Sequence, residues 1–540
     1  MDSSGVIICV FVVFWLAQSV GRAWLKGGDK PLYPYRPYFY LGSDVILCPG
    51  GPSLKDAEYY YLNCGDVGVD EENQGTRLGR NTVRLNIVDE RKIAAILTEA
   101  ENSAPETIRQ VLAKAKEKNG LTLEETAALL YANDSGLKDE LFNAASQVKN
   151  EIYGERIVFF APLYISDYCR NNCAYCNFHS ENKALKRERL SLDEIGRQAE
   201  FLIDMGHKRL LLEFGEDERY NNIEYVVEAI KKIYSVKKEK GNIRRLNVNI
   251  AATTVKDYRK LKSANIGTYQ LFQETYHRST YEKLHHGPKA DYERQITAHL
   301  RAFEAGIDDL GLGVLFGLYD WKFEVLALIQ HSQYLEKTLG VGPHTISVPR
   351  FCPASTVSYQ PEYPVSDEDF LKLIAILRLA VPYTGMIIST RETPQIRKQA
   401  FKIGISQASA ASVASPGGYG KVLKEEAQFN LQDERPLYEV VKGILEDDLL
   451  PSFCTACYRR GRTGEAFMEL SKPGEIHNFC RPNGLLTFAE YLEDFCNNGI
   501  YDKGYKLIRF YLSQIEDEAL RRQTQERLEK IKQGERDLYF

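Results

Sequence analysis

The chain has 540 residues, of which 44% are hydrophobic and 26% charged, a composition typical of a globular protein with more than one core-forming region. Its formal net charge of −5 lacks the basic footprint of a nucleic-acid-binding protein, so no nucleic-acid partner is expected. Eleven cysteines in a chain of this length favour a reducing compartment, either the cytoplasm or an anaerobic organelle, over secretion.

Residues 1–27 contain an apolar run, 5-GVIICVFVVFWLA-17, that is shorter than the roughly 20 residues of a membrane span. It is similar to the core of a signal peptide, although no Lys or Arg precedes it. Three interpretations stay open: a targeting segment or anchor with membrane contact at 5–17, a start-site artefact, or a buried helix. Residues 28–84 are rich in Tyr, Pro and Gly without a clear period, which predicts a linker or a poorly ordered extension.

Residues 85–155 form a predicted helical region. Apolar residues recur at helical spacing in 89-DERKIAAILTEAEN-102, 105-PETIRQVLAKAKEKNG-120 and 122-TLEETAALLYAN-133. Thr122 and Glu125 match a capping box, and Pro105 suits a first helical turn. We interpret these helices as packing elements.

Residues 156–420 show a different sequence pattern, in which short β-branched or aromatic runs alternate with amphipathic helical segments. The strand candidates are 157–165, 209–216, 245–252, 268–275, 309–317, 345–351, 386–392 and 404–410. This succession predicts an α/β fold of the (β/α)8 TIM-barrel type, with an open doubly wound sheet as the alternative. In a barrel, active groups lie at the carboxyl ends of the strands.

Three cysteines follow the first strand candidate, in 167-DYCRNNCAYCNFHSEN-182. A disulfide framework belongs to short secreted chains. A structural zinc ion would require a fourth ligand, for which His179 is near. Cys169, Cys173 and Cys176 could instead hold a 4Fe-4S cluster and leave one iron open, and we favour this interpretation.

The cysteine spacing, with an aromatic Tyr175 before the third cysteine, resembles the signature of radical S-adenosylmethionine (SAM) enzymes. The resemblance implies that the open iron binds SAM, whose cleavage yields a 5′-deoxyadenosyl radical. The cofactor-binding residues that it implies are Tyr175, Phe178, Gly215, Glu216, Gln273 and Glu274. For the two aromatic residues, a hydrophobic shield of the cluster stays open. For Gln273 and Glu274, the alternative is a structural polar network.

A second cysteine motif lies in residues 421–540, a region predicted to be mainly helical. Cys454 and Cys457 form a CxxC pair that Cys480 follows, and in isolation this pattern also suits zinc, with His477 near. Together with the barrel motif, 454-CTACYRRGRTGEAFM-468 and 478-NFCRPNGLLTFAEYLEDF-495 resemble the HydG family, the tyrosine lyases of FeFe-hydrogenase maturation. The resemblance runs from about residue 85 to the end and includes the segments ETYH (274–277), AGIDDLGLGVLFGLYDWKFE (305–324), VGPHTISVPR (341–350) and SPGGY (415–419).

This resemblance implies that L-tyrosine is cleaved to p-cresol and dehydroglycine, which then yields CO and cyanide at an auxiliary 4Fe-4S cluster on Cys454, Cys457 and Cys480. An extra iron, bound through free L-cysteine, would carry these ligands as a precursor of the hydrogenase H-cluster. The implied partners also include a reductant, such as ferredoxin or flavodoxin, and a hydrogenase maturation scaffold. No catalytic side chain is expected beyond the clusters and the cofactor.

Four further residues receive expected roles. Arg350, at the end of the sixth strand, is predicted to clamp the tyrosine carboxylate with help from Ser347, and a salt bridge lining the barrel is the alternative. His277, in ETYH, is predicted to shape the substrate pocket. His344, at the opposite mouth of the barrel, is predicted to ligate the extra iron, with a helix-capping or core histidine equally open.

The sequence departs from the family at Cys352, where a charged residue is expected before the proline, and at Ala411, where glycine is frequent. Two other functions stay open: an aromatic-amino-acid lyase of the thiamine-synthesis or tryptophan-cleaving kind, and a non-catalytic iron or zinc scaffold. The second cysteine motif argues against the first of these. Gly215, Glu216 and Arg350 argue against the second.

Overall fold

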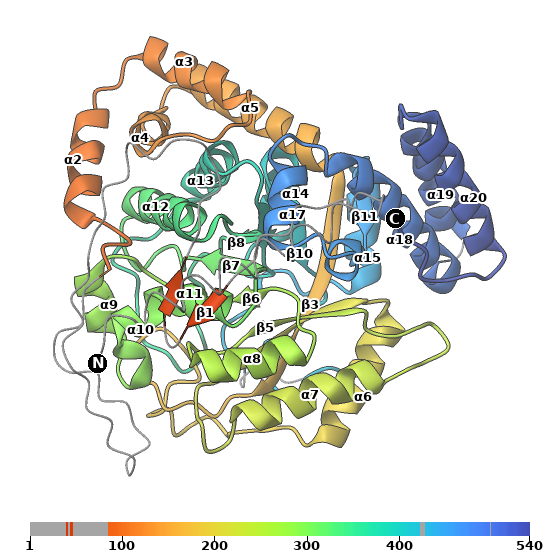
Figure 1. Ribbon diagram of the computed structural model, residues 1–540, viewed down its shortest axis with the longest axis horizontal. Helices are drawn as coiled ribbons and strands as arrows, with labels where there is room; N and C mark the ends of the chain where they lie inside the picture. The colour runs from red at the N-terminus through yellow and green to blue at the C-terminus, as the bar shows by residue number, and fades with distance from the viewer. Residues whose placement is uncertain (1–38, 42–43, 47–84, 422–426, 497) are drawn as a thin grey trace, which may run out of the picture. The chain divides into compact units, whose positions relative to one another are not determined.

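The computed structural model describes residues 39–41, 44–46, 85–421, 427–496 and 498–540 (Figure 1). It divides into two units, residues 1–82 and 83–540. In the first unit, β1 (Phe39–Leu41) and β2 (Asp44–Ile46) form an antiparallel pair within the predicted linker. The apolar run 5–17 lies outside the described residues, and no helix among those described is both long and apolar enough to cross a membrane.

The larger unit begins with a group of helices that pack against the barrel helices α12 and α13, as Figure 1 shows in orange. They are α2 (Glu90–Ala100), α3 (Pro105–Ala115), α4 (Leu123–Leu130) and α5 (Ser135–Tyr153). The capping box of Thr122 and Glu125 and the position of Pro105 in a first turn are both confirmed. α5 was not among the predicted helices, although Asp134 caps it by accepting bonds from two backbone amides.

Eight parallel strands form a closed barrel, because β10 pairs with β3 from Gln407 to Ser409. The predicted TIM-type barrel is therefore confirmed, and the open sheet is excluded. Every strand candidate of the sequence contains one of these strands or overlaps it. The strands are β3 (Arg156–Ser166), β4 (Arg209–Phe214), β5 (Arg245–Asn249), β6 (Tyr269–Gln270), β7 (Leu310–Gly313), β8 (Thr345–Ser347), β9 (Gly385–Ile388) and β10 (Gln407–Ser409).

Helices connect the strands and cover the outside of the barrel. Most of the longer ones start at a side-chain cap, such as Ser191 before α6 and Asn222 before α7, so local sequence fixes where each crossover begins. The connecting helices are α6 (Leu192–Met205), α7 (Ile223–Ser235), α8 (Val255–Ser263), α9 (Arg278–Leu284), η1 (Pro288–Ala290), α10 (Tyr292–Ile296), α11 (Ala298–Glu304), α12 (Trp321–Leu339), α13 (Asp367–Ala380) and α14 (Pro394–Ile403).

The C-terminal region is mainly helical, as predicted, but it also contributes a strand that was not predicted. β11 (Leu450–Ser452) pairs with the first residues of β3, at the amino end of the barrel. This pairing brings the second cysteine motif to the barrel's amino-terminal mouth. The helices are α15 (Leu437–Glu446), α16 (Ala456–Arg459), α17 (Gly464–Ser471), α18 (His477–Phe495), α19 (Asn498–Ser513) and α20 (Glu518–Lys532).

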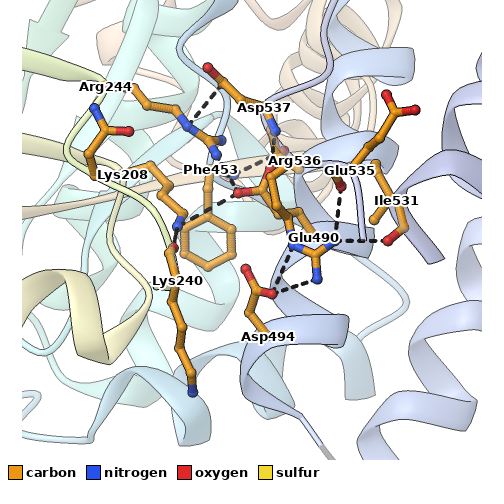
Figure 2. Close-up of polar contacts among 12 residues, drawn as sticks. Lys208, Lys240, Arg244, Phe453, Glu490, Asp494, Ile531, Glu535, Arg536 and Asp537 are labelled. Atoms are coloured by element: carbon orange, nitrogen blue, oxygen red, sulfur yellow. Dashed lines mark hydrogen bonds and ion pairs between the residues drawn. The ribbon is translucent and has the colours of Figure 1, made fainter. Parts of the chain in front are cut away.

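Buried ion pairs fasten the last residues to the barrel (Figure 2). Arg244, which precedes β5, contacts the Glu490 carboxylate of α18 and lies 2.9 Å from Asp537. Lys208 approaches the same glutamate at 3.7 Å, and both cationic side chains are almost fully buried. Because removal of one partner would leave a buried charge unpaired, these contacts hold the C-terminal segment in one position.

Candidate active site

The first cysteine loop follows β3 at the carboxyl end of the barrel. Hydrogen bonds between residues of the loop and its flanks fix its conformation. The Arg187 guanidinium donates hydrogen bonds to the backbone oxygens of Asp167, Phe178 and His179. The Ser180 amide donates to the Asn171 oxygen at 2.8 Å. One arginine thus ties together the two ends of the loop that carries the three thiols.

Cys169, Cys173 and Cys176 line one cavity, which we call the cofactor cavity. Burial raises the pKa of Cys176 to about 11 and that of Cys173 as well, and bound metal would reverse this because it deprotonates a coordinating thiol. In the described part of the chain, no group of His, Cys, Asp and Glu is placed to hold a single metal ion. His179 bonds to Asn172 at 2.9 Å instead. Three thiols that converge without closing on one ion fit an Fe–S cluster better than zinc.

The cofactor cavity gathers most of the residues predicted to bind the cofactor: Tyr175, Phe178, Gly215, Glu216 and Glu274. At Gly215 an added Cβ would lie 2.4 Å from the Tyr168 carbonyl oxygen, so only glycine fits there. The Glu216 carboxylate accepts bonds from Asn171 at 2.6 Å and Arg294 at 2.7 Å, which fix its orientation. Gln273 is buried outside this lining, and its side-chain nitrogen has no hydrogen-bond partner.

A second cavity, the barrel cavity, adjoins the cofactor cavity and extends into the barrel. The two share Tyr175, Cys176, Glu213, Asn249 and Glu274 among their lining residues. Phe160, Leu211 and Ile387 form an apolar cluster on its wall. An apolar chamber with a few polar groups is the usual form of a small-molecule site.

Two arginines at this end of the barrel differ in whether their guanidinium groups are free to bind a substrate carboxylate. Arg350 contacts the Glu392 carboxylate, lies 2.7 Å from Asp367 and does not line the barrel cavity. Arg391 lines the cavity and stacks over Phe429 at 3.3 Å, and no carboxylate of the described residues pairs with it. The structure therefore gives Arg350 the salt bridge that was the alternative to its predicted role, and leaves Arg391 facing the cavity. Ser347 does line the cavity, as its predicted role requires.

Glu213 faces both cavities and was not selected from the sequence. Burial raises its pKa to about 8, against the opposing effects of Arg391 and Asn249. A carboxyl group in this state can both donate and accept a proton near neutral pH. The one available signal was a carboxyl group among the apolar strand residues Leu210–Phe214, but the sequence does not show that it faces a cavity.

The two predicted histidines lie apart from the cofactor cavity. His277 stacks on Tyr319 with 3.7 Å between ring centroids and lines neither cavity, so the structure does not bring it to the predicted substrate pocket. His344 lies at the opposite mouth of the barrel, where its Nδ1 approaches Asp309 at 3.0 Å. Its ring stacks between Phe467 and Tyr458 of the C-terminal region.

The second cysteine site lies at that mouth. Cys454 follows β11, Cys457 belongs to α16 and Cys480 to α18. The Arg156 Nη2 atom donates to the Cys480 sulfur at 2.9 Å. Burial raises the pKa of each thiol, while Arg156 and Arg462 act to lower it. Guanidinium groups directed at thiolates fit an anionic Fe–S cluster, whose properties depend on hydrogen bonds to its sulfurs.

Sequence reasoning missed Arg156 because its partner is 324 residues away, and no local pattern signals such a contact. Near the same site, His477 has a buried Nδ1 without a hydrogen-bond partner, and burial lowers its pKa to about 4. Ala411, at the position where glycine was expected, has a φ of 50°. This left-handed backbone conformation explains why glycine suits that position.

A closed eight-stranded barrel with three thiols on the loop after its first strand defines a radical SAM enzyme. The family model of the radical SAM superfamily matches residues 163–329, and that of the Biotin and Thiamin Synthesis associated domain matches residues 347–450. This class implies a 4Fe-4S cluster and SAM as cofactors.

Comparison with individual proteins identifies the family within the radical SAM enzymes. A solved structure titled HydG, a maturase of the [FeFe]-hydrogenase, is 50% identical with a TM-score of 0.82, over 84% of this chain and 100% of that one. HydG from Carboxydothermus hydrogenoformans is 41% identical with a TM-score of 0.72, over 81% and 97%. 2-Iminoacetate synthase of Escherichia coli is 30% identical over 61% of this chain and 86% of its own length. The chain belongs to the HydG family of radical SAM maturases.

Proposed function

We propose that this enzyme cleaves L-tyrosine to p-cresol and dehydroglycine, and converts the second product to CO and cyanide on an iron held at the second cysteine site. The observation that carries the proposal is the presence of two three-cysteine sites at opposite mouths of one barrel, in a chain that spans a whole solved HydG chain. The E. coli relative supports the first half, because 2-iminoacetate is dehydroglycine by another name.

At the upper site, Cys169, Cys173 and Cys176 would hold a 4Fe-4S cluster, which with SAM supplies a 5′-deoxyadenosyl radical. Gly215 admits the methionine moiety close to the backbone. Glu216, oriented by Arg294, would accept hydrogen bonds from the methionine ammonium.

Tyrosine would occupy the barrel cavity. The guanidinium of Arg391, which no carboxylate of the described residues pairs with, suits the substrate carboxylate, because its planar fork can make two parallel hydrogen bonds. Glu213 lies where the barrel cavity meets the cofactor cavity, so it can hold the substrate amino group toward the cofactor and take up its proton. The apolar wall of Phe160, Leu211 and Ile387 excludes water from the reacting groups.

At the lower site, Cys454, Cys457 and Cys480 would hold the auxiliary cluster, with Arg156 donating to a sulfur. The extra iron, bound through free cysteine, is a substrate and later the cargo. His344 would ligate it through Nε2. The contact of its Nδ1 with Asp309 supports this role, because metal-binding histidines usually direct their other nitrogen to a carboxylate. A reductant and a hydrogenase maturation scaffold are the partners that this chemistry requires. The unpaired thiols of the described cysteines support a reducing compartment.

The test is anaerobic reconstitution with iron and sulfide, followed by incubation with SAM, dithionite, tyrosine, cysteine and ferrous iron. We expect p-cresol by chromatography and iron-bound carbonyl by infrared spectroscopy. A lyase that serves only imino-acid synthesis, as the 30% identical relative suggests, would give p-cresol without carbonyl. The absence of both products, with SAM still cleaved, would contradict the proposal.

A further inference from the structure

The barrel interior between the two cysteine sites is polar at its amino-terminal end. We call this set of side chains the lower layer: Arg209, Arg245, Thr268, Thr345 and Gln407. On each strand, a residue that lines the barrel cavity follows two or four positions later. Because side chains at even spacing on a strand point to the same side, all five residues of the lower layer point into the barrel. Barrel interiors are normally filled by bulky aliphatic residues at such positions.

Two guanidinium groups dominate the lower layer. Arg209 of β4 and Arg245 of β5 are register partners, and in parallel strands such partners point to the same side. They are only 3% and 7% exposed. The Arg209 Nη2 atom donates to the Gln407 side-chain oxygen, and Arg245 donates to the backbone oxygens of Asn265 and Ile266.

The two positive charges have no direct ion-pair partner among the described residues. Neither guanidinium forms an ion pair with any carboxylate of the described residues, and the Nε atom of each has no hydrogen-bond partner. The carboxylate of Asp309 lies near enough to Arg245 for the guanidinium to help lower its pKa, but its direct contact is with His344, at 3.0 Å. Burial of cations without a direct counter-charge is unfavourable, so this arrangement favours a bound anion.

The lower layer touches both sites. On the upper side, the Arg209 guanidinium packs 5.2 Å from the Phe160 ring, and Phe160 lines the barrel cavity. On the lower side, the Arg245 guanidinium lies 4.8 Å from the ring of Tyr458, the residue after Cys457. The Tyr458 hydroxyl also lies 3.1 Å from Thr268. An anion held here would therefore lie between the place where tyrosine is cleaved and the second cysteine site.

We propose that Arg209 and Arg245 form a binding site for the carboxylate of a small α-imino or α-keto acid, the class to which the tyrosine-derived fragment belongs. The inference rests on the proposed function and adds to it a place where the fragment is held inside the barrel. The paired cations retain the carboxylate, and the neutral groups of Gln407 and Thr345 supply further hydrogen-bonding capacity.

The probe is glyoxylate, a stable carboxylate that differs from the fragment by a carbonyl oxygen in place of the imine nitrogen. Its binding to the reconstituted enzyme, without SAM or tyrosine, can be measured by equilibrium dialysis with labelled glyoxylate. We expect Arg209→Gln and Arg245→Gln each to weaken binding by about 10- to 100-fold, the usual loss for one charge-assisted contact. Neutral glyoxylamide should not compete.

Arg244→Gln is the matched control. The same substitution is made at the residue before Arg245. The Arg244 guanidinium faces Glu490 and Asp537 on the outside of the barrel (Figure 2). Its glyoxylate affinity should equal that of the wild type. Arg391→Gln removes the cation of the upper cavity and should leave the affinity within about threefold, because the proposed site does not include that residue.

Wild-type affinity in both Arg209→Gln and Arg245→Gln would overturn the proposal, and so would loss of binding in Arg391→Gln alone. If the glutamine variants fail to fold, Arg209→Lys and Arg245→Lys keep the buried charge and should still weaken binding by about threefold to tenfold, since the fork is lost. Unchanged affinity in both lysine variants would then decide against the site.

A turnover measurement separates this proposal from the proposed function. Arg209→Gln should form p-cresol at the wild-type rate, because cleavage occurs above the lower layer, but should release more glyoxylate into solution for each p-cresol. Equal release would count against the site. If the wild type makes no p-cresol, the proposed function fails, while the binding experiment still tests the anion site independently.

Discussion

The upper and lower cysteine sites each contain three thiols, but in different surroundings. At the upper site, Cys169 and Cys176 pack against an apolar cluster that contains Phe178 and Cys352, and the cavity opens toward Glu213 and Arg391. At the lower site, Arg156 donates directly to Cys480, and Arg462 acts on Cys457. If each set holds a cluster, as proposed, the ligand sets are alike, and the surrounding groups must distinguish the chemistry.

This difference indicates a division of labour. The upper site adjoins a chamber lined by the Arg391 guanidinium and by the carboxyl groups of Glu213 and Glu274, as suits an amino acid substrate. The lower site is enclosed by cations and aromatic rings, as suits anionic ligands on iron. Substitutions at either site can test this difference separately.

The largest effect is expected from Cys173→Ala. Loss of one of three ligands from a site without a spare thiolate should abolish both 5′-deoxyadenosine and p-cresol, as chromatography would measure. Iron content should fall by about one cluster per chain. Cys496→Ala is the matched control, since this free thiol belongs to neither site. Substantial SAM cleavage in Cys173→Ala would refute the cluster assignment.

The double change Cys454→Ser, Cys457→Ser should affect only the second half of the reaction. A hydroxyl is a poor substitute for a thiolate toward iron–sulfur centres, so no iron carbonyl should appear in the infrared spectrum. Formation of p-cresol should continue at a rate within about tenfold of the wild type. Carbonyl formation at the normal rate would instead revive a structural role for these cysteines.

Arg391→Gln should raise the apparent KM for tyrosine by about 10- to 100-fold through loss of a charge-assisted contact. Arg350→Gln provides the contrast, because its guanidinium is already paired with Glu392. It should leave KM within about threefold but lower the stability by roughly 3 kcal/mol, since a buried carboxylate loses its partner. The reverse pattern would return the carboxylate-binding role to Arg350.

The smallest effect is expected from Glu213→Gln and appears as a pH dependence of stability. With a folded pKa of about 8, against 4.5 as the ordinary value, Glu213 binds its proton more tightly in the folded state. Its contribution is therefore fully present below pH 4.5 and is lost as pH rises toward 8. Between pH 5 and pH 9 the Tm of the wild type should fall by about 2 °C or more relative to the glutamine variant. A constant Tm difference across this range would show that Glu213 titrates normally.

The sequence by itself determined the barrel strands, most of the helices before them and both cysteine motifs, but not α5 or β11. Runs such as 209-RLLLEFGE-216 identify strands through residue type, and the Thr122–Glu125 capping box identifies a helix start, because these signals act within a few residues. The spacing of Cys169, Cys173 and Cys176 on one loop is likewise local. The count and order of the strands therefore favoured a barrel but left an open sheet as the alternative, which only the pairing of β10 with β3 excluded.

Only the tertiary structure decided which side chains meet. Closure of β10 on β3, the pairing of β11 with β3 and the bond from Arg156 to Cys480 join residues hundreds of positions apart. The choice between Arg350 and Arg391 depended on where Glu392 lies. Local propensity fixes the backbone of each element, whereas the partner of a charged side chain depends on strand register and on long-range packing. The unpaired cations of the lower layer could be found only once the strands were in register.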